Sequence, residues 1–77
     1  MRNLRLQPLN PVVCRVLTNQ GEHVGNLKLI GPVWKFKAIG YDHQGGVMAG
    51  GGPLTHRHNM VFVALDETEV NARLGAA

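Results

Sequence analysis

The chain has 77 residues, about half the length of a typical domain, so we expect one small domain without separate cofactor-binding and substrate-binding halves. Hydrophobic residues make up 44% of it and charged residues 17%, which excludes wholesale disorder. The formal net charge is +3 at pH 7, and the charges are unevenly placed. Residues 1–65 carry seven Lys or Arg against two acids, whereas residues 66–77 carry Arg73 against Asp66, Glu67 and Glu69. A basic body attracts polyanions by long-range steering, although many proteins of similar charge bind none.

Cysteine content and hydropathy bear on the compartment. Cys14 is the single cysteine, so the chain forms no internal disulfide and no four-thiolate zinc site, and a reducing compartment is expected. No stretch approaches the roughly 18 apolar residues of a membrane span, and the N-terminal residues lack the apolar core of a signal peptide. We therefore predict a cytoplasmic protein with no membrane partner.

The first predicted element is a hairpin. Residues 1–10 have no clear period, and we leave open that they form a loose N-terminal arm. Residues 12–18 are largely apolar apart from Arg15 and end at Asn19-Gln20-Gly21, a turn that would lead the chain back through Val24.

A second hairpin carries the clearest strand pattern. In residues 33–41 apolar side chains alternate with lysines, which is typical of a strand with one buried face, and Leu27 and Leu29 flank Lys28 in the same way. Gly31-Pro32 lies between the two runs as a turn signal. The alternation assigns Leu27, Leu29, Trp34 and Phe36 to the core, and Lys28, Lys35 and Lys37 to the opposite face.

The rest of the chain predicts a short return strand, a buried strand and a helix. Residues 47–48 follow a turn at residues 42–46, and residues 60–65 are apolar on both faces, as expected of a strand covered on each side. Asp66 suits the N-cap of a helix that ends near Leu74, with Gly75 at the C′ position. Acidic residues in its first turn and Arg73 in its last complement the helix dipole.

Together these elements predict an α+β fold in a single domain, residues 1–77. We expect a small, mostly antiparallel meander sheet of four to five short strands, with one C-terminal helix packed on it. Short strands followed by a C-terminal helix are similar to the general plan of small sheet-based DNA-binding modules, such as the arm-type domains of integrases. This likeness concerns the fold plan, and function has to be argued from the site.

The lysine face is the leading candidate site. Lys28, Lys35 and Lys37, accompanied by Tyr41 and Arg15, would form a surface that tracks a nucleic-acid backbone, because cations bind phosphates and a ring stacks on a base. The alternative is that these lysines are the solvated side of an amphipathic strand, which is the more common situation. The second functional hypothesis is a protein-interaction module that uses the glycine-rich loop or a sheet edge.

The segment at residues 50–59 combines glycines with a His-x-His pattern. The sequence argues against a phosphate-binding loop, because its glycines would have to run into a helix N-terminus, whereas these precede a strand-like run. If the segment is extended, His56 and His58 project to one side and could share a metal, with a third ligand from His23, His43, Asp42 or Cys14. Gly50, five intervening residues and then His-x-His resemble the opening of the first cupin motif, but the glutamate of that motif is missing. The simpler reading is a flexible or bulged connection.

Nothing in the sequence makes a positive case for an enzyme. Cys14 lies inside an apolar run, where an inert buried thiol is the usual outcome. The clustered carboxylates of residues 66–69 are already explained by helix capping. We therefore expect a non-enzymatic binding module with no catalytic residue and no cofactor.

Overall fold

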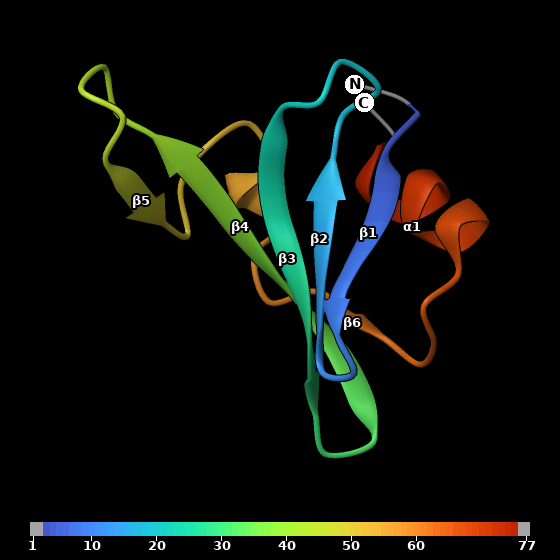
Figure 1. Ribbon diagram of the computed structural model, residues 1–77. Coiled ribbons are helices and arrows are strands. Elements are labelled where there is room, and N and C mark those ends of the chain that lie inside the picture. Colours follow the sequence, from blue (N-terminus) through green and yellow to red (C-terminus); the bar gives the residue numbers. More distant parts are fainter. Residues whose placement is uncertain (1–2, 76–77) are drawn as a thin grey trace.

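The computed structural model describes residues 3–75 and consists of one antiparallel sheet and one C-terminal α-helix (Figure 1). Five strands follow one another as a meander in the order β1-β2-β3-β4-β5, and β6 pairs with β4 on the same edge as β5, nearer the start of β4. The elements are β1 (Arg5–Asn10), β2 (Val13–Leu17), β3 (His23–Ile30), β4 (Val33–Tyr41), β5 (Val47–Ala49), the 3₁₀ turn η1 (Thr55–Arg57), β6 (Val61–Phe62) and α1 (Glu67–Leu74). The predicted α+β fold, a meander sheet with one C-terminal helix, is confirmed.

Most of the N-terminal segment, for which a loose arm was considered, is a strand. Arg5–Asn10 forms β1, which pairs antiparallel with β2, and Leu4 just before it is buried. The outer edge of β1 is held by α1: the side-chain amide of Asn71 accepts from the Leu4 N–H and donates to the Leu4 carbonyl, and Glu67 accepts from the Leu6 N–H at 3.0 Å. Residues 1–2 of the expected arm lie outside the described residues.

The predicted turns join the strands as expected. β2 and β3 form one hairpin, and β3 and β4 form the next, with Gly31 at a positive φ of 61° in the turn between them. Between β4 and β5, the Asp42 carboxylate accepts hydrogen bonds from the Gln44 N–H at 2.9 Å and the Gly46 N–H at 2.7 Å. An Asp side chain that bonds its own turn is a common way of fixing a hairpin.

The core lies between one face of the sheet and α1, and it includes part of the predicted set. Its buried members are Leu4, Cys14, Val16, Val24, Leu27, Phe36, Ala38, Leu54, Phe62, Val70 and Leu74. Trp34 is half-buried and packs against this cluster, whereas Leu29 is 37% exposed, so the prediction of a core position was wrong for Leu29. The β3–β4 hairpin extends beyond the level of α1, so its tip lacks a second layer (Figure 1).

The expectation of a strand buried on both faces at residues 60–65 was also wrong. The strand there is the two-residue β6, in which Phe62 is buried while Val61 is 40% exposed, and Val63 beyond it is 77% exposed. β6 lies at the edge of the sheet, and α1 covers its inner side. The Arg73 guanidinium lies 4.4 Å from the centre of the Phe62 ring and donates to the Val61 carbonyl at 2.8 Å.

The helix begins where the sequence predicts. The Asp66 carboxylate accepts from the Thr68 N–H at 3.0 Å and the Glu69 N–H at 3.4 Å, which makes Asp66 the N-cap. Gly75 is the C-cap and has right-handed φ and ψ, so it does not adopt the left-handed C′ conformation expected of it. Among residues 3–75, no helix has the length and apolar character needed to cross a bilayer.

Candidate nucleic-acid interface

The strand register brings the five predicted binding residues to one face of the sheet. Arg15 of β2 is paired with Asn26 of β3, and Asn26 is paired with Lys37 of β4, so these three side chains form a row across the sheet. Lys28 and Lys35 are paired directly in the neighbouring row. Paired residues share a face, and these alternate with the buried Cys14, Leu27 and Phe36. Tyr41 follows Lys35 and Lys37 in the same alternation. We call this surface the basic face.

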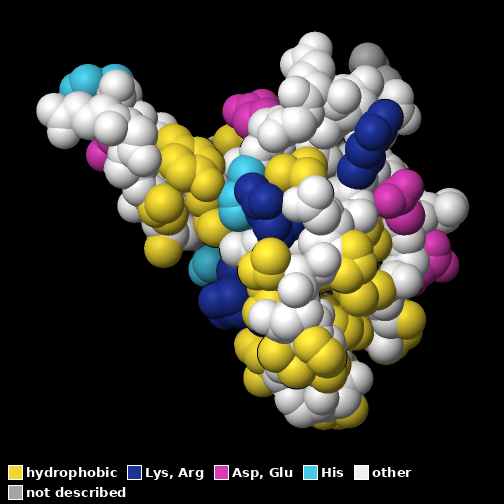
Figure 2. Space-filling view, in the orientation of Figure 1, with side chains coloured by type: hydrophobic (Ala, Val, Ile, Leu, Met, Phe, Trp, Pro, Cys, Tyr) yellow, Lys and Arg dark blue, Asp and Glu magenta, His cyan; other side chains and the backbone are white. Residues whose placement is uncertain are grey.

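The charges of the basic face have no acidic counterpart in the sheet. The six strands contain Arg5, Arg15, Lys28, Lys35 and Lys37 and no Asp or Glu. Figure 2 shows Lys and Arg side chains over the sheet, and acidic side chains beside α1, near the upper end of the sheet and on the β4–β5 arm. The ion pair found between described residues is Arg73–Glu69 at 3.5 Å, which belongs to the helix. No ion pair between described residues therefore involves a cation of the basic face.

Neutral side chains orient two of these cations. The Arg15 guanidinium donates to the Gln7 side-chain carbonyl at 3.0 Å, and the Lys37 ammonium donates to the Asn59 side-chain carbonyl at 2.6 Å. Amide partners restrict the side chain without cancelling its charge. Arg15 and Lys37 are thus held in position and retain their full charge.

A hydrogen-bonded chain links Tyr41 to the same row. The Tyr41 hydroxyl lies 3.0 Å from His23 Nδ1, and His23 Nε2 lies 2.9 Å from Asn26 Oδ1. An amide oxygen accepts only, so Nε2 of His23 donates to Asn26, and Nδ1 is the atom that shares a hydrogen bond with the Tyr41 hydroxyl. The hydrogen bond to His23 holds the Tyr41 hydroxyl in place. Tyr41 is 49% exposed, so its ring is still open to solvent. Sequence reasoning gave His23 no role here, because the contact depends on the register of two strands.

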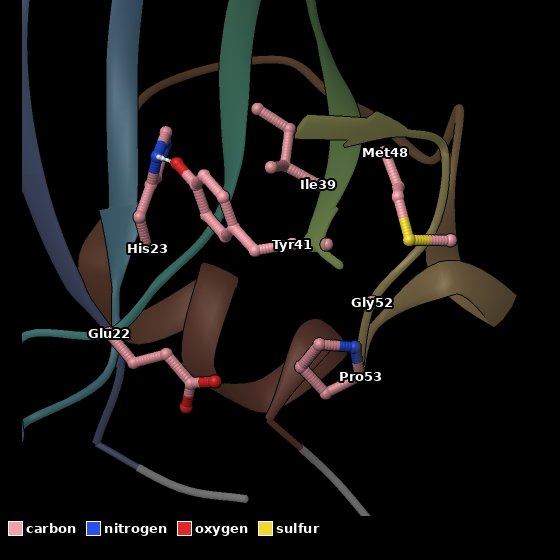
Figure 3. Close-up of a pocket in the computed structure, with 8 residues that line it drawn as sticks. Glu22, His23, Ile39, Tyr41, Met48, Gly52 and Pro53 are labelled. Carbon is pink, nitrogen blue, oxygen red and sulfur yellow. Dashed lines mark hydrogen bonds between the residues drawn. The ribbon is translucent and has the colours of Figure 1, made fainter. Parts of the chain in front are cut away.

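A pocket of about 350 Å³ adjoins this chain of hydrogen bonds. Figure 3 shows Glu22 and His23 on one side of it and Met48, Gly52 and Pro53 on the other, with Tyr41 and Ile39 between them. Its walls are mixed: Ile39, Met48 and Pro53 supply apolar surface, and Glu22, His23 and Tyr41 supply polar groups. Sequence reasoning did not find this pocket.

The glycine-rich loop forms the pocket wall through close backbone packing. A Cβ on Gly40 would lie 2.5 Å from the Gly52 nitrogen, and one on Gly52 would lie 2.2 Å from the Ile39 carbonyl oxygen. Gly52 also has a positive φ of 86°, which glycine adopts without strain. The absence of side chains at Gly40 and Gly52 therefore lets the loop pack closely against β4.

The metal hypothesis for His56 and His58 required an extended segment that projects both side chains to one side, and the structure does not have one. The segment is not extended, because residues 55–57 form η1; His56 is exposed, and His58 follows the turn. His58 Nδ1 accepts a hydrogen bond of 3.0 Å from the Ala38 N–H, so that nitrogen is engaged in the sheet. Within residues 3–75, no group of three or more His, Cys, Asp or Glu side chains is arranged to hold a metal ion.

Cys14 has the character of an inert buried thiol. Its side chain is fully buried in the core, and loss of hydration there raises the pKa of the thiol above its ordinary value of 9.0. The thiolate needed for nucleophilic chemistry is therefore disfavoured at neutral pH.

No protein-family model, curated protein or solved structure matches this chain. The basic face and the pocket beside it are therefore the features from which a function can be inferred.

Proposed function

We propose that this protein is a small nucleic-acid-binding module that holds phosphate groups on the basic face. The observation that carries the proposal is the direct pairing of Lys28 with Lys35 on adjacent strands, with no acidic side chain in the sheet. Side chains directly opposite each other have Cβ atoms about 4.5–5.5 Å apart, and like charges in such pairs are destabilising. A polyanion bound across the face would relieve this repulsion, and Arg15 and Lys37 in the next row would extend the contact.

Tyr41 adds a second type of contact to this face. Its ring is half-exposed and is fixed by the hydrogen bond to His23, so little conformational freedom is lost when a base stacks on it. A stacked base contributes about 1–3 kcal/mol in single-strand binding. The proposed compartment is the cytoplasm, where a free buried thiol such as Cys14 stays reduced.

The test is the salt dependence of oligonucleotide binding. Replacing Lys28, Lys35 and Lys37 together by Gln removes up to three phosphate contacts, which flattens the slope of log K against log salt by up to about 0.9 per contact on duplex DNA or about 0.7 on single strands. A charge control compares Lys35→Gln with Thr68→Glu, since both lower the net charge by one but Thr68 lies on α1. Equal effects of the two single variants would show that net charge, and not the basic face, governs binding.

The second candidate, a protein-interaction module, is favoured by an apolar end of the sheet. The β1–β2 and β3–β4 turns lie side by side, joined by a 2.8 Å hydrogen bond from the Leu29 N–H to the Val12 carbonyl. Four aliphatic side chains are exposed there: Leu9, Val12, Leu29 and Ile30. Figure 2 shows hydrophobic side chains gathered at this lower end. Absence of nucleic-acid binding at about 50 mM salt, where electrostatic attraction is strong, would favour this candidate over the first.

A further inference from the structure

We propose that the pocket beside Tyr41 takes one unstacked base of a single-stranded nucleic acid, and that Glu22 gives it a preference for guanine. This inference rests on the proposed function, since the phosphates of the same strand would lie on the basic face.

The position of the pocket connects it to the basic face. Tyr41 and His23 line it, and His23 donates to Asn26, which lies between Arg15 and Lys37 in the cross-sheet row. A strand whose phosphates contact this row therefore has the pocket within reach of an adjacent base. Single strands can turn a base outward in this way, because their bases are not held by pairing.

The volume and lining of the pocket are compatible with one base. Its volume of about 350 Å³ lies near the lower end of the range for small-molecule sites, roughly 300–1,000 Å³. Ile39, Met48 and Pro53 supply apolar surface for the faces of a base, and the Tyr41 ring supplies an aromatic one. Gly40 and Gly52 also line the pocket and have no side chain, and the close contact of their backbones leaves no room for one.

Glu22 determines which base edge is preferred. It is exposed, it lines the pocket, and no donor within residues 3–75 bonds to its carboxylate. In Figure 3 the Glu22 carboxylate extends from the side of His23 toward the side where Pro53 lies. Guanine presents two adjacent N–H groups on its Watson–Crick edge, which match the two oxygens of a carboxylate. Uracil presents one N–H between two carbonyl oxygens, and these repel a carboxylate. In a duplex this edge is occupied by pairing, so the preference applies to single strands.

The experiment compares two single-stranded oligomers of equal length and charge: an oligouridine and the same oligomer with one central guanosine. We expect the guanosine oligomer to bind about fivefold more tightly or better, the lower bound for one bidentate hydrogen-bonded pair. NMR titration should place the added shifts at His23, Tyr41 and the Met48 methyl group. Glu22→Gln should abolish the preference and leave the salt slope unchanged. Glu69→Gln makes the same change of charge on α1 and should retain the preference.

Two negative results are distinguishable. Equal affinities for the two oligomers, combined with a salt slope that still depends on Lys28, Lys35 and Lys37, would overturn the base pocket and leave the proposed function standing. If neither oligomer binds at about 50 mM salt, the proposed function itself is wrong. Heteronuclear spectra of each variant would show that the fold is intact.

Discussion

His58 provides the sharpest test of how the glycine-rich segment is held to the sheet. On the outer edge of β4, backbone groups on either side of Ala38 find backbone partners: the Phe36 N–H donates to the Met60 carbonyl at 2.8 Å, and the Ala38 carbonyl accepts from the Gly50 N–H at 2.8 Å. The Ala38 N–H instead donates to His58 Nδ1 at 3.0 Å. A side chain therefore takes the place of a missing strand residue between β6 and β5.

Removing this acceptor should be costly. Ala38 is 1% exposed, so His58→Ala leaves a buried N–H without a partner, a loss of about 1–3 kcal/mol in the free energy of unfolding. A domain this small has a total stability of about 3–5 kcal/mol, so the effect would be large. His58→Asn should recover part of the loss, because its Oδ1 is attached to Cγ in the same way as Nδ1 of histidine. His56→Ala, at an exposed position two residues away, should change stability by less than about 0.5 kcal/mol.

Urea unfolding gives the stability of each variant, and amide hydrogen exchange reports on the Ala38 N–H itself. We expect exchange at Ala38 to accelerate in His58→Ala and to slow again in His58→Asn. If His56→Ala and His58→Ala have equal effects, or if His58→Asn is no better than His58→Ala, the assigned role of His58 as a backbone-acceptor substitute is wrong.

Three further predictions concern the helix cap, the buried thiol and the lysine pair. Asp66→Ala should lower stability by about 1 kcal/mol, and an unchanged thermal midpoint would contradict the cap. Burial raises the pKa of Cys14, so the unfolded chain loses this proton first as the pH rises through 9.0. The free energy of unfolding should therefore decline with rising pH above about 9 in the wild type and decline less in Cys14→Ala, as urea unfolding on both sides of this value would show. Lys28→Glu places opposite charges across from each other and should raise the midpoint of thermal unfolding through a gain of about 0.2–1 kcal/mol, while oligonucleotide affinity falls.

The sequence predicts those strands and helices in which burial of one face produces a periodic pattern of apolar residues. β3 and β4 alternate because one face meets the core, and α1 carries a matching N-cap and dipole pattern. β1 is not predicted, because all but one of its six residues are exposed and neither face therefore shows a periodic apolar pattern. The run at residues 60–65 misleads for the opposite reason: Val61 and Val63 are apolar yet exposed, because β6 is a short edge strand.

The candidate site likewise has parts that the sequence predicts and parts that it does not. The basic face is predictable, because alternation alone decides which side of a strand Lys35 and Lys37 occupy. The Tyr41–His23 hydrogen bond joins residues 18 apart in sequence and depends on strand register, which alternation does not supply. The close packing of Gly40 and Gly52 and the role of His58 also depend on where the loop crosses β4. Neither composition nor spacing contains that information.

A substitution in the Lys28–Lys35 pair also distinguishes two interpretations of the basic face, as a binding surface and as an ordinary solvated strand face. Solvation requires a polar side chain at position 28, and a glutamate would meet that need while attracting Lys35. A lysine opposite a lysine also keeps the alternation of polar and apolar side chains, but the two charges repel each other and lower the stability. No acidic side chain of the sheet offsets this repulsion. If the face is only solvated, Lys28→Glu changes stability and leaves no other measurable trace. If the face binds phosphates, the same substitution stabilises the fold and weakens binding together, so opposite signs of the two effects support the binding function.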